Sequence, residues 1–376
     1  MQRKLNIAIF GHKRVPSREG GVEIVVEELS TRMADCGHNV TLYNRRGHHV
    51  SDKSVKTERI SDYHGIKIRS VLTIDKKGLA AVTSSFFASL KSAFSKAQVV
   101  HIHAEGPAAM TPLLKLFKKR VIVTVHGLDW QRDKWSDGFA SKYIKFGEKM
   151  AVKFADEIIV LSNRVKEYFK DTYDRDTVYI PNGVNAPEII EPERIAEEFS
   201  LKKDSYILFL GRLVPEKGVH LLIDAFKDVK TDKKLVIAGG TSDTDDYVSQ
   251  LEDKAAHDDR IIFTGFQQGQ VLEELYSNAY VYVLPSLLEG MPLSLLEAMS
   301  YKNCCVVSDI AECIEVVKDK AVVVKAGDVG VLTSALQKLC DDKELVKEYK
   351  EKSQDYILKK YNWDEVVSKT IALYKK

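Results

Sequence analysis

The sequence predicts an α/β protein built from two doubly wound parallel sheets in tandem. Apolar runs of four to seven residues alternate with longer segments of helical periodicity, a pattern typical of parallel α/β folds. With 376 residues, the chain exceeds the roughly 100–200 residues of one domain. A cluster of helix and strand breakers at 181–187 interrupts the alternation. We therefore expect one domain over 1–180 and a second over 181–360.

The first domain begins with a strand and a strongly amphipathic helix. Val22, Val25, Val26, Leu29 and Met33 share one face of that helix. Several of the expected strands are apolar on both faces, as covered parallel strands must be. These strands are Lys4–Phe10, Asn39–Tyr43, Ile66–Val71, Gln98–His103, Val121–His126, Glu157–Leu161 and Val178–Ile180.

The second domain shares this architecture without an evident sequence repeat. A final apolar stripe that includes Trp363, Ile371 and Tyr374 predicts a helix over 361–376, which we expect to brace the two domains together. The expected strands of the second domain are Tyr206–Leu210, Lys234–Ala238, Arg260–Thr264, Tyr280–Leu284, Cys304–Val307 and Ala321–Val324.

Composition excludes several classes of protein. Hydrophobic residues make up 44% and charged residues 29%, as in folded globular proteins. No apolar run approaches the ~20 residues of a membrane-spanning helix, and the N-terminus lacks a secretory pattern. The five cysteines include no C-x-x-C pair, which fits a reducing compartment. We expect a cytoplasmic protein, with the inner face of the cell membrane as a candidate site of peripheral contact.

Charge is distributed unequally along the chain. Residues 1–180 hold 31 Lys and Arg against 20 Asp and Glu, whereas residues 181–376 hold 25 against 34. The basic half suggests an anionic partner: a phosphate-bearing substrate, an acidic membrane surface or a nucleic acid. Two differently solvated surfaces would explain the same numbers.

The loop after the first strand lacks the common nucleotide-binding fingerprints. It contains no G-x-G-x-x-G, and the chain has no Gly-Lys pair for a Walker A loop. It does place Gly20-Gly21 directly before the amphipathic helix, where free backbone N–H groups and the helix dipole favour an anion. A plain tight turn is the alternative.

Two loops of the second domain carry charged residues at strand ends, where doubly wound sheets bind ligands. Arg212 and Lys217 follow the strand 206–210 and could converge on one diphosphate, unless both are simply solvated. Glu289 is expected in a loop and Glu297 inside the helix that begins near Pro292. A partly buried Glu297 needs hydrogen-bond donors, and sugar hydroxyls would serve. The alternative for Glu297 is a solvent-facing side chain.

These motifs carry a family resemblance that covers essentially the whole chain. Gly20-Gly21, Gly211-Arg212 with Lys217-Gly218, and Glu289-x7-Glu297 occur in the order found in the retaining, nucleotide-sugar-dependent glycosyltransferases of family 4, which the chain resembles. The resemblance implies the GT-B fold, with two Rossmann-like domains facing across a cleft. The stretch 16–29 also resembles the N-terminal domain of a subgroup associated with bacterial capsule and polysaccharide assembly, including rhamnosyltransferases.

The resemblance also implies roles for individual residues. Arg212 and Lys217 would hold the donor diphosphate, Glu297 the ribose hydroxyls and Glu289 the donor sugar. His126 matches a histidine beside the reacting sugar, although a structural strand-end histidine is the alternative. Gly20 and Gly21 would approach the diphosphate from the first domain. The loop Gly290, Met291, Pro292 and Leu293 would bring backbone N–H groups near the sugar or phosphate.

The implied activity is transfer of a hexose-type unit, with retention, in cell-surface polysaccharide synthesis. UDP-sugars are the favoured donors and dTDP-rhamnose is the second choice; the acceptor would be a saccharide or a lipid-linked saccharide. Such enzymes generally need no metal or other cofactor. The metal candidates are His101-x-His103, Asp174-Arg175-Asp176 and Asp243-Thr244-Asp245, and we expect none to bind metal.

Other functions remain as alternatives. An epimerase or phosphorylase could use the same double fold, and a non-catalytic protein could bind sugar nucleotides on it. Nucleic-acid binding would rest only on the basic first half, and we do not expect it.

A membrane contact is a further expectation for the first domain. The segment 79–96 combines Phe86, Phe87, Leu90 and Phe94 with lysines, and 113–120 combines leucines with four basic residues. Apolar and basic residues at helical spacing are typical of interfacial helices. In the alternative, these aromatic residues pack inward against the sheet.

Overall fold

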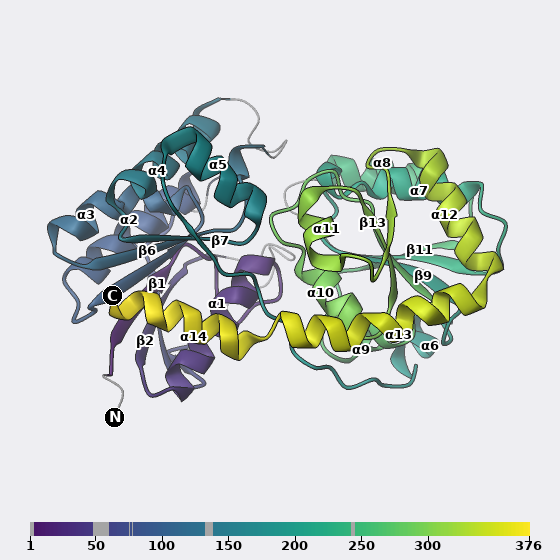
Figure 1. The fold of residues 1–376 in the computed structure, drawn as a ribbon, viewed down its shortest axis with the longest axis horizontal. Coiled ribbons are helices and arrows are strands. Elements are labelled where there is room, and N and C mark those ends of the chain that lie inside the picture. The colour runs from purple at the N-terminus through teal and green to yellow at the C-terminus, as the bar shows by residue number, and fades with distance from the viewer. Residues whose placement is uncertain (1–3, 48–59, 75, 77, 132–137, 242–244) are drawn as a thin grey trace. The chain divides into compact units, whose positions relative to one another are not determined.

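The protein forms two compact units (Figure 1). The computed structural model describes residues 4–47, 60–74, 76, 78–131, 138–241 and 245–376. The first unit contains the chain up to Asn182 together with Trp363–Lys376, and the second contains Gly183–Asn362. The chain therefore passes between the units at 182–183 and again at 362–363. No helix in the described ranges has the length and apolar character that crossing a bilayer requires.

The first unit is built on an eight-stranded sheet in the order β3-β4-β2-β1-β5-β6-β7-β8. Every neighbouring pair is parallel except β3 and β4. The sequence did not predict β3, which has two residues and lacks an apolar run. The strands are β1 Asn6–Phe10, β2 Asn39–Arg45, β3 Asp62–Tyr63, β4 Ile66–Val71, β5 Val99–His103, β6 Arg120–Val125, β7 Glu157–Val160 and β8 Val178–Tyr179.

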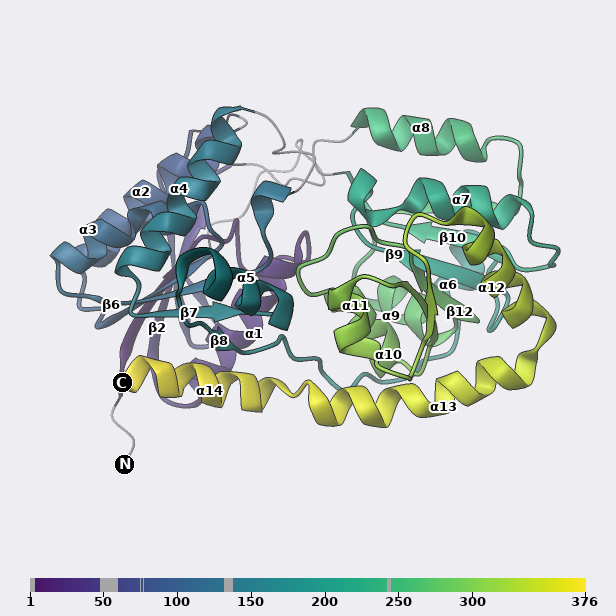
Figure 2. The ribbon, with the colours of Figure 1, turned by 45° about the horizontal axis from the view of Figure 1, so that its top comes forward.

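Helices cover both faces of this sheet. In Figures 1 and 2, α2, α3 and α4 lie on one face and α1 and α14 on the other. The terminal helix α14 packs on α1 and β6, so it belongs to the first unit. The helices are α1 Gly21–Asp35, α2 Leu79–Ala93, α3 Thr111–Leu116, α4 Phe139–Phe154, α5 Asn163–Tyr173 and α14 Trp363–Lys375, with short 3₁₀ turns η1 Pro107–Met110 and η2 Asp129–Gln131.

Helix α2 turns its small residues inward and aromatic residues outward. Phe86 and Phe94 are 45% and 72% exposed, and Phe87 and Leu90 are half-buried. The inward-packing alternative is therefore wrong for Phe86 and Phe94. The buried residues of α2 are Ser84, Ser85, Ala88, Ser89, Ser92 and Ala93.

The second unit is an entirely parallel six-stranded sheet in the order β11-β10-β9-β12-β13-β14. In Figures 1 and 2, α7, α8 and α12 lie on one face and α9, α10 and α13 on the other. The strands are β9 Tyr206–Leu210, β10 Lys234–Ala238, β11 Ile261–Gly265, β12 Val281–Leu284, β13 Cys304–Ser308 and β14 Val322–Val324. The helices are α6 Arg194–Phe199, η4 Pro215–Lys217, α7 Val219–Lys227, α8 Asp245–Ala255, α9 Gln270–Ser277, α10 Leu293–Ser300, α11 Ala311–Val317, α12 Val329–Asp341 and α13 Lys343–Lys360.

These observations confirm the prediction of two Rossmann-like α/β units. The strand order reverses direction between β1 and β5 in the first unit and between β9 and β12 in the second. Loops that leave the carboxyl ends of two such strands diverge to opposite faces and leave room for a ligand between them. The order of strands therefore marks one candidate ligand edge on each unit.

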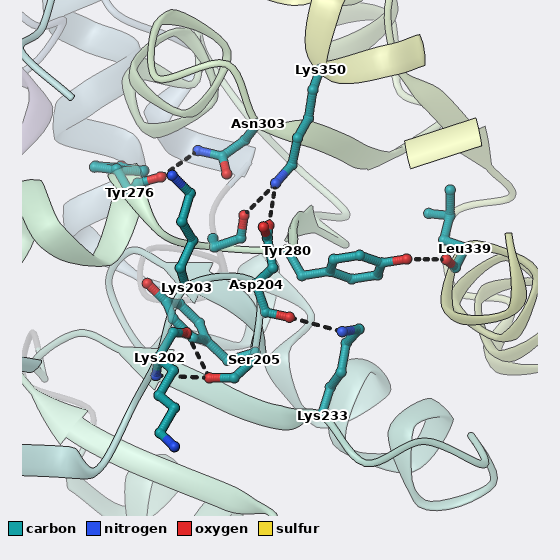
Figure 3. A network of polar contacts seen from close by, with 12 residues as sticks. Lys202, Lys203, Asp204, Ser205, Lys233, Tyr276, Tyr280, Asn303, Leu339 and Lys350 are labelled. Atoms are coloured by element: carbon teal, nitrogen blue, oxygen red, sulfur yellow. Dashed lines mark hydrogen bonds and ion pairs between the residues drawn. The ribbon is translucent and has the colours of Figure 1, made fainter. Parts of the chain in front are cut away.

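A polar network lies at the edge of the second sheet where the strands begin, opposite the candidate ligand edge (Figure 3). Lys350 Nζ lies 2.6 Å from Asp204 Oδ1. Lys233 Nζ donates to the Asp204 carbonyl oxygen at 2.8 Å and lies 3.7 Å from the centroid of the Tyr280 ring. Tyr280 in turn donates its hydroxyl proton to the Leu339 carbonyl oxygen at 2.7 Å. These contacts fix α12 and α13 against the strand starts, so we assign them to stability.

Candidate active site

The loops after β9 and β12 meet at the switch point of the second sheet. Leu287 N–H donates to the Glu216 carbonyl oxygen at 2.8 Å. Gly218 has φ +67, and a Cβ there would lie 2.1 Å from the Pro285 carbonyl oxygen. Only glycine permits this approach, which brings the residues of both loops together.

Lys217 and Glu289 form an ion pair between these loops. Lys217 Nζ lies 2.5 Å from Glu289 Oε1, and the Ser286 hydroxyl donates to the same oxygen at 2.7 Å. The side chains of Lys217 and Glu289 are only 13% and 7% exposed. The sequence predicted both residues for the site but not their pairing. Each charge is fixed by the other before any ligand binds.

The backbone around Arg212 is held by the neighbouring strand β10. Gly211 N–H donates to the Ala238 carbonyl oxygen at 3.0 Å, and Leu213 N–H donates to Gly240 at 3.1 Å. A Cβ on Gly239 would lie 1.8 Å from the Gly211 carbonyl oxygen. Arg212 is half-buried at the carboxyl end of β9, as predicted. Gly239 was not singled out from the sequence, because its neighbour across the sheet is known only from the fold.

Glu289 lies in a loop and Glu297 lies in α10, as predicted. The Tyr276 hydroxyl donates to Glu297 Oε2 at 3.1 Å. Burial, and then the Glu297 carboxylate, raise the pKa of Tyr276, so this phenol keeps its proton. Glu297 is thus oriented by a tyrosine of α9 that the sequence analysis did not single out.

The loop before α10 is well packed. Gly290 and Pro292 are buried, while Met291 and Leu293 pack partly against the core of the second unit. The carbonyl oxygen of Pro292 accepts hydrogen bonds from Leu295 and Leu296 N–H at the start of the helix. This packing gives the backbone of the loop a fixed position at the same sheet edge as Lys217.

Gly20 and Gly21 lie at the start of α1, but a carboxylate already occupies this helix end. A Cβ on Gly20 would lie 2.4 Å from Glu23 Oε2. Glu23 is buried, and its Oε1 accepts a hydrogen bond from Lys13 N–H at 2.8 Å. Because the Glu23 carboxylate lies against Gly20, a phosphate bound there would meet negative charge. The sequence predicted the glycine pair at the helix start, but not that the Glu23 carboxylate lies against it.

His126 follows β6 and pairs with a second buried histidine. Its Nε2 lies 2.9 Å from His103 Nδ1. Burial, and then His101 and His126, lower the pKa of His103 well below its usual range, so the ring is neutral. His103 Nε2 is buried without a hydrogen-bond partner in the described part of the chain. A buried N–H without a partner is rarer than a buried acceptor without one, so we place the proton of His103 on Nδ1, which donates it to His126 Nε2. The ring N–H of His126 is then on Nδ1.

The metal candidates make other contacts. His101 lies 2.7 Å from both the Tyr374 hydroxyl and Thr124 Oγ1. Asp174 and Asp176 lie 2.6 and 3.4 Å from Lys170 Nζ. Asp243 and the side chain of Asp245 lie outside the described residues. Within the described ranges, no group of three or more His, Cys, Asp or Glu is arranged to hold a metal ion.

The candidate residues therefore form two sets, one on each unit. Arg212, Lys217, Glu289 and Glu297 gather around the β9 and β12 ends of the second sheet. His126, Gly20 and Gly21 follow the carboxyl ends of β6 and β1 in the first.

Two family models match the chain, one on each unit. The model described as Glycosyltransferase Family 4 matches residues 19–187, and the model described as Glycosyl transferases group 1 matches residues 191–356. Together they cover nearly the whole chain.

Three relatives are 27–28% identical to this chain in the aligned regions. An uncharacterized glycosyltransferase of Methanocaldococcus jannaschii matches over 62% of this chain and 64% of its own length. The O-antigen chain mannosyltransferase RfbU of Salmonella typhimurium matches over 70% and 78%. A UDP-Gal:alpha-D-GlcNAc-diphosphoundecaprenol alpha-1,3-galactosyltransferase of Escherichia coli matches over 66% and 68%.

Solved structures share the fold across both units. Sucrose-phosphate synthase from Thermosynechococcus elongatus superposes with a TM-score of 0.84 at 20% identity, covering 99% of this chain and 98% of that one. HepE of Anabaena, in complex with UDP-glucose, superposes with a TM-score of 0.79 at 14% identity, covering 98% and 99%.

Proposed function

This chain is a glycosyltransferase of the GT-B fold and the family 4 type, and we propose that it transfers a sugar from a nucleoside diphosphate sugar to a saccharide or lipid-linked saccharide, with retention. The observation that carries the proposal is the buried Lys217–Glu289 pair at the switch point, beside the strand end that presents Arg212. Arg212 and Lys217 would bind the diphosphate, and Glu289 and Glu297 would accept hydrogen bonds from the sugar and ribose hydroxyls.

The mechanism follows from where charge develops. When the bond between the sugar and the diphosphate breaks, negative charge builds on the leaving phosphate, and a fixed Lys217 and Arg212 stabilise it. His126 would donate a hydrogen bond to the donor sugar from Nδ1. We assign no carboxylate as a covalent nucleophile and favour attack on the same face, assisted by the leaving phosphate.

The donor and the biological setting are proposed from the relatives. A UDP-sugar is the favoured donor, since one structural neighbour binds UDP-glucose and one relative is named for UDP-galactose. A role in cell-surface polysaccharide synthesis is supported by a relative named for O-antigen chains and one named for a diphosphoundecaprenol acceptor.

A screen of UDP-, GDP- and dTDP-sugars tests the proposal. A matching donor should raise the melting temperature by mass action, and purified protein should slowly hydrolyse that donor. Stabilisation without hydrolysis or transfer would indicate a sugar-nucleotide-binding protein. No stabilisation by any of them would contradict the proposed donor class.

Glu297→Gln and Glu289→Gln should separate binding from transfer. Ribose lies away from the reacting bond, so Glu297→Gln should mainly weaken nucleotide binding, roughly 10-fold for a lost charged hydrogen bond. Glu289→Gln should leave free-nucleotide binding nearly unchanged and lower kcat, because the donor sugar is attached at the reacting bond. Equal affinity of UDP for the two variants would contradict this division of roles.

We also propose that the reaction needs no metal, because Lys217 and Arg212 supply positive charge to the leaving group. Excess EDTA should leave the rate nearly unchanged. Inhibition that Mn²⁺ or Mg²⁺ reverses would contradict this and direct attention to Asp243 and Asp245.

We propose further that α2 binds an acidic membrane surface. Its outward face carries Phe86, the exposed Phe94 directly follows its last residue, and Lys91 and Lys96 are exposed nearby. The segment 113–120 contributes less than expected, because α3 ends at Leu116 and Lys115 pairs with Asp156 at 2.8 Å. Lys119 donates to the carbonyl oxygens of the 95–97 turn.

Sedimentation with liposomes tests this contact. Each lysine near an anionic surface contributes ~1 kcal/mol, so binding to phosphatidylserine vesicles should be weak and lost at high salt. Phe86→Ser with Phe94→Ser should abolish it. Val323→Ser with Val331→Ser, which alters two exposed apolar residues of the second unit, should not. Equal recovery in the supernatant with anionic and neutral vesicles at both salt concentrations would contradict the proposal.

A further inference from the structure

Two fully buried glutamates lie together in the first unit. Glu105 follows β5, and Glu148 lies in the middle of α4. A Cβ on Gly147 would lie 2.0 Å from the Glu105 carbonyl oxygen, so glycine allows the two segments to touch. Two buried carboxylates at close range cannot both stay ionised at a reasonable cost, and one must hold a proton.

The hydrogen-bond donors around the pair identify which carboxyl is ionised. Glu148 accepts from the Tyr168 hydroxyl at 2.9 Å, from the Tyr173 hydroxyl, and from Trp130 Nε1 at 3.3 Å. Three donors suit a carboxylate. The carboxyl group of Glu105 accepts a hydrogen bond at Oε2 from Asp129 N–H at 2.8 Å. Its Oε1 is buried and receives no donor from the described part of the chain, so a proton on Glu105 satisfies it.

The surrounding charges favour the same assignment. Glu148, Asp129 and Tyr173 interact electrostatically with Glu105, and the ring of Tyr143 packs against the neighbouring Gly106. Lys145 Nζ lies 3.9 Å from the centroid of the Trp130 ring. Burial, then the hydrogen bond to Glu148 and the charges of Asp129 and Glu148, raise the pKa of Glu105 well above its usual range.

We propose that Glu105 is a positioning residue that keeps its proton at neutral pH, donates it to Glu148, and with Glu148 fixes the segment 127–131 that follows His126. Glu105 accepts a hydrogen bond from Asp129 N–H and Glu148 accepts one from the Trp130 indole, so the pair holds the first two of the three residues of η2. The proposal rests on the role of His126 in the proposed function, but the protonation itself is testable without any substrate.

The pH dependence of stability gives that test. The unfolded chain releases the Glu105 proton above about pH 4.5, whereas the folded protein retains it, so stability falls as pH rises toward the folded pKa. Glu105→Gln keeps a donor to Glu148 and an acceptor for Asp129 N–H without a titratable proton. The melting temperature of Glu105→Gln minus that of the wild type should therefore increase as the pH rises above about 4.5 toward the folded pKa of Glu105, by up to about 3 °C per pH unit. Glu167→Gln, at an exposed position of α5, should follow the wild type at every pH.

Activity gives a second readout. Glu105→Gln should retain kcat/KM within about twofold at pH 7, and Glu105→Ala should lose about 10-fold or more, because the segment after His126 is then released. A constant difference in melting temperature across pH would overturn the proposal. So would equal loss of activity in the Gln and Ala variants. If no donor is turned over at all, the proposed function fails while the melting data still decide the state of Glu105.

Discussion

Replacing Lys217 by alanine is expected to lower turnover about 100-fold or more, because the variant loses a fixed positive charge where the leaving diphosphate becomes more negative. Arg212→Ala should cause a loss of the same order. The measurement is kcat with saturating donor. Lys338→Ala, at an exposed lysine of α12 in the same unit, is the matched control and should retain wild-type turnover. Near-normal activity in both site variants would contradict the assignment to the diphosphate.

The Lys217 variant should also be less stable, since its partner is buried. Without Lys217, the Glu289 carboxylate keeps only the Ser286 hydroxyl at Oε1, and breaking a buried ion pair costs about 3 kcal/mol or more. The double variant Lys217→Met with Glu289→Gln should recover most of this stability, because it leaves no unpaired charge. It should not recover turnover. Recovery of both would mean that the pair is structural and takes no part in the reaction.

Gly239→Ala is the second change with a large expected effect. The added Cβ would lie 1.8 Å from the Gly211 carbonyl oxygen, so the backbone next to Arg212 must move. Overpacking of this kind costs about 1–3 kcal/mol, and a displacement of about 1 Å in a positioning group can lower turnover about 100-fold. Measured kcat should fall while the far-ultraviolet circular dichroism spectrum is retained.

The neighbouring glycine provides the control for this change. A Cβ on Gly240 would lie 3.3 Å from Phe266 Cβ, a contact that a displacement of a few tenths of an ångström relieves. Gly240→Ala should therefore keep turnover within about twofold. If Gly239→Ala were equally active, the contact between Gly239 and Gly211 would not position Arg212.

The sequence by itself determined the architecture of this protein. Thirteen of the strands were predicted within one or two residues at each end, because a covered strand must be apolar and the helices between strands must show a 3.6-residue period. The missed strand β3, Asp62–Tyr63, is not part of an apolar run, unlike the equally short β8, which belongs to the apolar run Val178–Ile180. The charged residues after β9 and β12 were found for a similar reason: they directly follow strands in the chain, so their position at a sheet edge is a local property.

The tertiary structure alone decided which side chains meet. Lys217 and Glu289 are 72 residues apart, and they pair because β12 lies beside β9 in the sheet. Tyr276 and Glu297, and likewise Glu105 and Glu148, come from different elements and meet only in the folded chain. The outward orientation of Phe86 and Phe94 also depends on which face of α2 meets the sheet. Periodicity and propensity report on neighbours in the chain, whereas strand order, close glycine contacts and burial set the charge state and contacts of a site.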